Sequence, residues 1–93
     1  MKTNILIPTP LRQFTNNRDS VEVEGASVGE ALTNLCAVYA PLKRHLYADD
    51  GKLRSFVNVY VNDEDVRYLQ KERTPLTEND VVSIIPSIAG GNP

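Results

Sequence analysis

The chain has 93 residues, which is enough for one domain around one hydrophobic core and leaves little core to spare for a deep, enclosed catalytic cavity. Its 10 Lys and Arg residues are outnumbered by 12 Asp and Glu residues, so the net charge of -2 disfavours sequence-independent nucleic-acid binding, which needs clustered cations. The single cysteine excludes an intramolecular disulfide. No apolar run approaches the roughly 20 residues of a membrane span, and the first residues lack the long apolar stretch of a secretory signal. We therefore expect a reducing, cytoplasmic setting.

The first part of the chain predicts two short strands. Residues 4–7 form an apolar run that is followed by Pro8 and Pro10, which cannot donate to a sheet ladder, so the strand should stop near residue 7. After a polar turn at 15–19, residues 20–24 alternate polar and apolar side chains with the period of a half-buried strand. Two short strands around a turn indicate a hairpin.

The main helix is predicted to begin at Ser27. Ser27 and Glu30 have the spacing of a capping box, in which each side chain satisfies backbone N–H groups at the helix start. Pro41 should end this helix or mark its last turn, and residues 42–46 predict a further short helical turn. One apolar face is expected from residues spaced three and four apart: Val28, Leu32, Leu35, Cys36 and Tyr39.

The second half of the chain predicts strands separated by polar segments. Residues 56–61 are the strongest strand pattern, followed by a charged turn at 62–65 and a short edge strand at 66–69. Residues 74–80 indicate a loop with a helical turn, and the apolar segment 81–86 a closing strand. One helix across a mixed sheet of four to five strands buries the apolar face of each element, so the sequence predicts an α+β roll.

Three features that could carry chemistry are interpreted as structural or solvated. Cys36 lies on the apolar helix face and is expected to be a buried, inert thiol. His45 has no second ligand at metal spacing and is expected to be solvated. The turn with Asp63, Glu64 and Asp65 is too short for a calcium loop and is expected to be solvated, although it could also meet a basic partner surface.

A docking face is predicted beside the chain's end. If Val82 and Ile84 face the core, the alternation of the strand sends Ile85 outward. Together with Pro8, Ile85 would then form an exposed apolar patch of the kind that often marks a partner site, unless it covers a second small cluster. The residues predicted to contribute to partner docking are Ile85, Pro8, Ile88 and Ala89.

Residues 80–91 resemble the end of the MoaD/ThiS family of ubiquitin-like sulfur carriers, with an acidic turn, an apolar strand, a proline, a short apolar link and Gly-Gly. Residues 7–12 resemble the family's first strand and turn, and residues 56–67 resemble the middle strands of the CysO-type branch that serves cysteine biosynthesis. The resemblance implies a β-grasp domain over residues 1–88 with a flexible C-terminal tail at 89–93.

The resemblance also implies a carrier, not an enzyme, whose working part is Gly90-Gly91. A ubiquitin-activating-type enzyme would adenylate the terminal carboxylate with ATP, and a sulfur donor would convert it to a thiocarboxylate that an acceptor enzyme uses as a nucleophile. The carrier itself would hold no cofactor and no catalytic side chain. Glycine suits this role because it has no Cβ and fits a narrow channel.

One departure from the family pattern is that Asn92 and Pro93 follow Gly91, where such carriers usually finish. Either a zinc protease of the JAMM type cleaves between Gly91 and Asn92, as the pattern implies for extended tails, or the extension is an irrelevant addition to a disordered terminus.

The identity of the acceptor stays open at this point. The CysO-type resemblance favours a cysteine-synthase-like enzyme acting on an activated serine, but a molybdopterin precursor, a thiamine precursor, a natural product or a tRNA base are alternatives. A protein modifier joined to lysines through Gly91 would use the same activated tail. A plain β-grasp interaction module with an inert tail is the remaining hypothesis.

Overall fold

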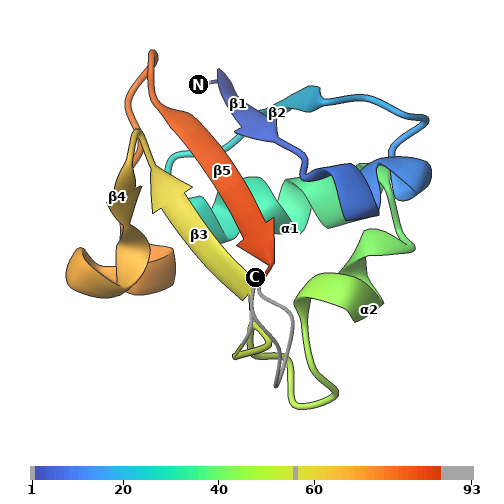
Figure 1. Ribbon diagram of the computed structural model, residues 1–93. Coiled ribbons are helices and arrows are strands. Elements are labelled where there is room, and N and C mark those ends of the chain that lie inside the picture. The colour runs from blue at the N-terminus through green and yellow to red at the C-terminus, as the bar shows by residue number, and fades with distance from the viewer. Residues whose placement is uncertain (1, 56, 87–93) are drawn as a thin grey trace.

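The computed structural model describes residues 2–55 and 57–86, which form a five-stranded sheet, two α-helices and three short 3-10 helices (Figure 1). The longest described helix has 11 residues, too few to cross a membrane. In chain order the elements are β1 (Lys2–Leu6), η1 (Thr9–Phe14), β2 (Ser20–Glu24), α1 (Val28–Val38), α2 (Leu42–Leu46), β3 (Val57–Val61), β4 (Glu64–Asp65), η2 (Val66–Tyr68), η3 (Lys71–Arg73) and β5 (Val81–Pro86).

The first and last strands lie side by side in the sheet, whose order is β2-β1-β5-β3-β4. β1 and β5 are parallel, with Leu6 opposite Ser83, whereas the other neighbouring strands are antiparallel. α1 crosses one face of this mixed sheet and leaves the other face open (Figure 1). This arrangement is the α+β roll that the element pattern predicts, and it has the β-grasp fold that the family resemblance implies.

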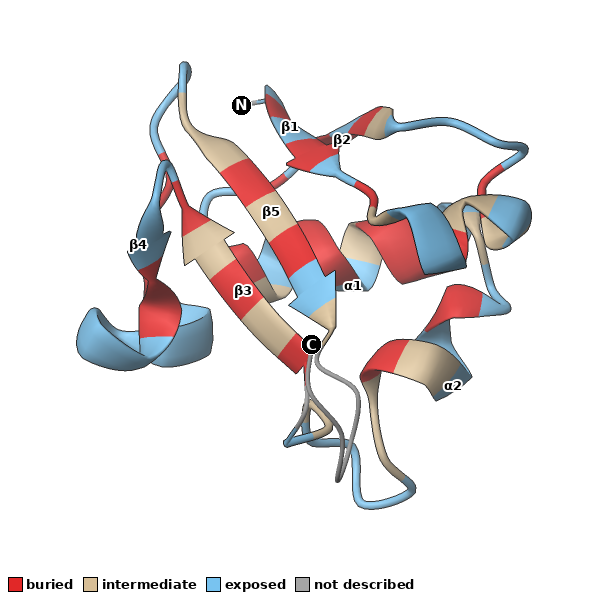
Figure 2. Ribbon diagram, viewed as in Figure 1, coloured by how far each residue is buried: buried red, intermediate tan, exposed pale blue. Residues whose placement is uncertain are grey.

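The core lies between α1 and the covered face of the sheet (Figure 2). Strands β1 and β3 alternate buried and more exposed residues, as half-buried strands do. On α1, the predicted apolar face is confirmed for Val28, Leu32, Leu35 and Cys36, which are all buried. Tyr39, the fifth residue predicted for that face, is the C-cap and packs against the core half-buried.

The start of α1 has the predicted cap. The hydroxyl of Ser27 accepts a hydrogen bond from the Glu30 backbone N–H at 3.2 Å. The Glu30 carboxylate accepts in return from the backbone N–H of Ala26, at 3.0 Å, one residue before the position usual in a capping box. The first bond satisfies a donor that a helix start otherwise leaves without a partner, and the two bonds together fix where α1 begins.

The predicted edge strand at 66–69 is wrong. The edge strand is β4, at Glu64–Asp65, and the chain then turns at once into the 3-10 helix η2. The reason is a tight turn at Asn62 and Asp63, both with positive φ, which reverses the chain earlier than the apolar residues suggest. Asp65 then accepts from the Arg67 backbone N–H and bends the chain away from the sheet.

Of the side chains expected to be solvated, one is buried and another is half-buried. Asp65 is buried, whereas its neighbours Asp63 and Glu64 are exposed, so only part of the acidic turn faces water. His45 is half-buried because its ring stacks on Phe14, with the ring centroids 4.3 Å apart. The stacking of His45 on Phe14 joins two segments whose proximity the local sequence pattern does not report.

Candidate functional site

The central strand β5 leads directly toward the C-terminal residues. It lies between β1 and β3: β1 pairs with residues 81–83, whereas β3 pairs with residues 82–86, so β3 alone holds the last residues of β5 in the sheet. Val82 and Ile84 are fully buried, whereas Ile85 is 47% exposed on the open face opposite Asn58 of β3. The predicted alternation of β5 is therefore confirmed, with Ile85 pointing away from the core.

The open face carries a second exposed apolar side chain that the sequence interpretation missed. Leu6 is 43% exposed, and its parallel pairing with Ser83 places it on the same side of the sheet as Ile85. Pro8, which the sequence predicts beside Ile85, follows two residues after Leu6 and is half-buried. The period-two alternation with buried Ile5 could have identified Leu6, but the apolar run at 4–7 hides which residues face outward.

We call Leu6, Pro8 and Ile85 the open-face patch. It lies on β1 and β5 and on the residues just after β1, close to where β5 ends. Exposed leucine and isoleucine on a sheet face without a covering helix are suited to dock against an apolar partner surface. The role of Pro8 and Ile85 in docking stays a prediction, as does that of Ile88 and Ala89.

A shallow groove lies beside the end of β5, and we call it the tail-root groove. Its volume is about 390 Å³, and the Arg54 Nε donates to the Arg44 carbonyl oxygen across it at 3.0 Å. The described lining includes two arginines and no carboxylate, so an anionic group would be favoured at this point. The lining residues are Pro10, Leu11, Arg44, His45, Arg54, Val57 and Pro86.

The predicted reactive residues lie outside the described residues, which end at Pro86. They are Gly90 and Gly91 of the predicted sulfur-carrying end, the processing site at Gly91 and Asn92, and the docking residues Ile88 and Ala89. Phe56, the first residue of the predicted strand 56–61, is likewise outside them.

Cys36 is buried, as predicted, on the core side of α1. Burial raises the pKa of its thiol, and the positive charge of Lys43 lowers it by a smaller amount. A thiol that resists ionisation is a poor nucleophile. Within residues 2–55 and 57–86, no group of three or more His, Cys, Asp or Glu side chains is arranged to hold a metal ion.

A β-grasp domain with an apolar patch on its open face, and with Gly-Gly after its last strand in the sequence, fits the class of ubiquitin-like carriers and modifiers. A family model described as the ThiS family matches residues 5–91, so the matched range ends at the second glycine. The chain belongs to the ThiS family, which confirms the resemblance to MoaD/ThiS proteins.

The relatives point to one branch in particular. The chain is 40% identical over 93 residues to the sulfur carrier protein CysO of Mycobacterium tuberculosis, covering 98% of this chain and 100% of the relative. A chain in the crystal structure of the Amycolatopsis orientalis BexX/CysO complex superposes with a TM-score of 0.86 at 39% identity, covering 96% of this chain and 99% of that chain. The small archaeal modifier protein 3 of Haloferax volcanii is 38% identical over 68 residues, which cover 73% of each chain.

Proposed function

We propose that this protein is a sulfur carrier that supplies sulfur for biosynthesis, with cysteine as the product. The observation that carries the proposal is the near full-length similarity to CysO sulfur carrier proteins, together with a family match that ends at Gly91. The β5 strand supports this role because the last described strand lies at the centre of the sheet order and carries Ile85 of the open-face patch near its end.

The chemistry requires a free carboxylate on Gly91. The residues after Gly91 are removed first, by a JAMM-type zinc protease that cleaves the Gly91–Asn92 peptide bond. A ubiquitin-activating-type enzyme then joins the Gly91 carboxylate to the AMP part of ATP, and pyrophosphate leaves. A sulfur nucleophile attacks the acyl carbon, AMP leaves, and the product is a thiocarboxylate.

The thiocarboxylate sulfur would be the nucleophile in a cysteine-synthase-like acceptor enzyme. In the net reaction, the sulfur forms a bond to the side-chain carbon of an activated serine derivative, and the activating group leaves from that carbon together with the serine oxygen. Hydrolysis of the resulting thioester linkage, or acyl transfer followed by proteolysis, returns the carrier. The chain's own contribution is to bind its partners and to present one atom, because the activating enzyme supplies ATP and no residue of the carrier is needed as a catalyst.

The test is intact-mass analysis of the purified chain after incubation with the candidate protease, the activating enzyme, ATP and sulfide. We expect the mass of a chain that ends at Gly91 with one oxygen replaced by sulfur. A variant truncated after Gly91 should load without the protease, whereas the full chain should not. Gly91→Ala should slow loading sharply while its unfolding curve stays unchanged. If the truncated chain accepts no adenylate from a competent activating enzyme, the proposal is wrong.

A second candidate function is protein modification, which the 38% identity to the small archaeal modifier protein 3 of Haloferax volcanii supports. Both functions use an activated Gly91. The same mass analysis separates them, because a modifier yields heavier, isopeptide-linked conjugates in a cell extract, whereas a carrier yields the free thiocarboxylate.

A further inference from the structure

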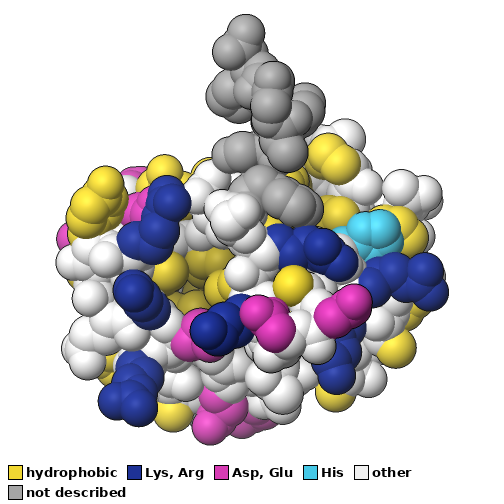
Figure 3. Space-filling model, turned by 90° about the horizontal axis from the view of Figure 1, so that it is seen from below, with side chains coloured by type: hydrophobic (Ala, Val, Ile, Leu, Met, Phe, Trp, Pro, Cys, Tyr) yellow, Lys and Arg dark blue, Asp and Glu magenta, His cyan; other side chains and the backbone are white. Residues whose placement is uncertain are grey.

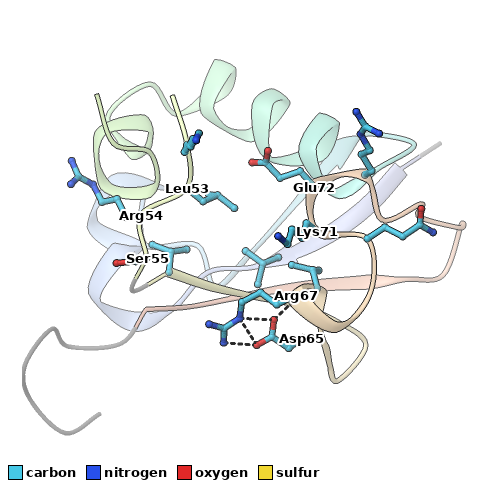
Figure 4. A pocket seen from close by; sticks show the side chains of 13 residues that line it. Leu53, Arg54, Ser55, Asp65, Arg67, Lys71 and Glu72 are labelled. Atoms are coloured by element: carbon cyan, nitrogen blue, oxygen red, sulfur yellow. Dashed lines mark hydrogen bonds and ion pairs between the residues drawn. The ribbon is translucent and has the colours of Figure 1, made fainter. Parts of the chain in front are cut away.

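A second groove opens beside β3, and we call it the β3-edge groove. It exists because β4 pairs only with Tyr60 and Val61, so the described sheet has no strand next to Val57–Val59 on that side. Its volume is about 550 Å³. The segment that carries η2 and η3 forms one wall, and residues 52–55 form the other (Figure 4).

The β3-edge groove has an apolar floor and a cationic rim. The space-filling view shows hydrophobic side chains at the base of a hollow, with Lys and Arg side chains around it (Figure 3). The floor is made of Leu53, Val57, Val59 and Val66, and the cationic residues are Lys52, Arg54, Arg67, Lys71 and Arg73. Only Asp65 and Glu72 oppose these five cations, in a chain whose overall charge is -2.

Most of this positive charge is available to a ligand. The Asp65 carboxylate is already engaged by Arg67, whose guanidinium folds back onto it at the rim (Figure 4). No ion pair joins Lys52, Lys71 or Arg73 to an acidic side chain within the described part of the chain. These three side chains are therefore free to meet carboxylates brought by a partner.

The backbone at the rim is also unusual. Lys71 has a φ of 54°, in the left-handed region that favours glycine. The other non-glycine residues with positive φ among those described are asparagine or aspartate, which tolerate this conformation in turns. A lysine held in a strained conformation at the edge of a groove is a feature that occurs at binding sites.

We propose that the β3-edge groove is a docking site for an acidic segment of a partner protein, with at least one apolar side chain inserted into the floor. Carboxylates would pair with the rim cations, and the apolar floor would supply burial that a purely ionic patch lacks. Tyr68 and Leu69, on the same wall segment, are 86% and 38% exposed and extend the contact surface. No aromatic side chain is among the described lining residues, so the groove lacks the stacking platform that single-stranded nucleic acid uses.

This site is distinct from the open-face patch, since it contains none of its residues. It shares Arg54 and Val57 with the tail-root groove, so the two grooves adjoin. A partner could therefore hold the domain at the sheet edge while the open face remains available to another surface. The proposal does not depend on sulfur loading, and its test can be read without any activating enzyme.

The experiment is a titration of the full-length, ¹⁵N-labelled chain with a blocked synthetic peptide in which aspartates and glutamates flank a pair of leucines, followed by amide chemical shifts. We expect the largest shifts at Leu53, Val59 and Val66. Lys71→Glu/Arg73→Glu should weaken binding by at least about tenfold. The matched control, Arg18→Glu/Lys43→Glu, makes the same charge change at exposed residues outside the groove and should keep the affinity within about twofold.

Two further arms test the chemistry of the occupant. Replacing the peptide leucines by serine should weaken binding by at least about fivefold, because the floor then gains no burial. Lys71→Gln/Arg73→Gln removes the two charges without reversing them and replaces the Glu variant if that variant does not fold. It should lose affinity for the peptide too, by a smaller factor. The proposal is overturned if the peptide does not bind at low salt or if the chemical-shift changes centre on Leu6 and Ile85. It is also overturned if the control variant loses as much affinity as the groove variant. The proposal is also overturned if the chain binds inorganic phosphate or a single-stranded oligonucleotide as tightly as it binds the acidic peptide.

Discussion

The carboxylate of Asp65 and the guanidinium of Arg67 form a forked ion pair only two residues apart, with Arg67 Nη2 2.7 Å from Asp65 Oδ2. The Arg67 backbone N–H also donates to Asp65 Oδ1 at 2.9 Å and so caps η2. The side-chain hydrogen bonds from Arg67, and then its backbone N–H, hold the pKa of Asp65 below its ordinary value. This pair directs the chain out of β4 and thereby creates one wall of the β3-edge groove.

The ionisation of Asp65 should contribute to stability in a pH-dependent way. Because its pKa is lowered by folding, the contribution is present above the unfolded pKa of about 3.9 and is lost as pH falls through the folded pKa. Asp65→Asn keeps the cap and loses the charge, so its deficit in the free energy of unfolding should be largest at neutral pH and vanish in acid. Arg67 is 59% exposed, so solvent screening keeps this deficit small.

Urea unfolding of Asp65→Asn and the unmodified chain, at neutral pH and at about pH 3, measures this difference. Asp65→Ala is the comparison variant, because it also removes the cap and should cost about 1 kcal/mol more than Asp65→Asn. A deficit of Asp65→Asn that grows on acidification would contradict the assignment.

Gly25 is predicted to be required by the close approach of β2 and α1. A Cβ at this position would lie 2.8 Å from the Cα and backbone nitrogen of Ala31, which a side-chain movement cannot relieve. Gly25→Ala should therefore lower the free energy of unfolding by about 2 kcal/mol. Gly51→Ala is a useful control, since nothing lies within 4 Å and its cost of about 1 kcal/mol would come only from its φ of +83°. Equal unfolding midpoints in urea for the two variants would rule out the steric explanation.

The open-face patch is predicted to dock the activating enzyme. Ile85→Arg should reduce kcat/KM for thiocarboxylate formation by at least about tenfold, mainly through KM, because the exposed isoleucine loses its apolar contact with the partner. Leu6→Arg should act in the same way. Val38→Arg is the matched control: Val38 is 65% exposed but lies on α1, outside the patch. Initial rates at increasing carrier concentration give both constants, and an effect of Val38→Arg as large as that of Ile85→Arg would count against the patch.

Cys36 is predicted to be unreactive while the chain is folded. Its raised pKa leaves less thiolate at a given pH than a free thiol has, and the core around α1 blocks access. Reaction with Ellman's reagent near pH 8 should be at least about a hundredfold slower in the native chain than in urea. Iodoacetamide should then alkylate a C-terminal thiocarboxylate selectively, which gives a clean assay for sulfur loading. Rapid native labelling of Cys36 would show that the core opens more readily than its packing implies.

Much of the fold follows from local patterns. The alternation at 20–24 and 57–61, the cap at Ser27 and Glu30, and the apolar steps along α1 each report which side of an element is buried, and the structure agrees at these positions. The prediction was wrong at 66–69 because turn geometry at Asn62 and Asp63, together with the Asp65–Arg67 pair, overrode a segment that is too short to define a strand.

The sequence by itself determined the α+β roll and the outward position of Ile85, since periodicity is a property of neighbouring residues. The β-grasp class and the role of Gly-Gly came from the resemblance to a known family. Only the tertiary structure decided that Leu6 shares the open face with Ile85, because that depends on the parallel pairing of the first and last strands. It also decided that Leu53, Val59 and Lys71 line one groove. The physical reason is that the periodicity of a segment shows which side of its helix or strand a residue lies on. The residues that it meets from other segments depend on strand order and on where the short strand β4 ends.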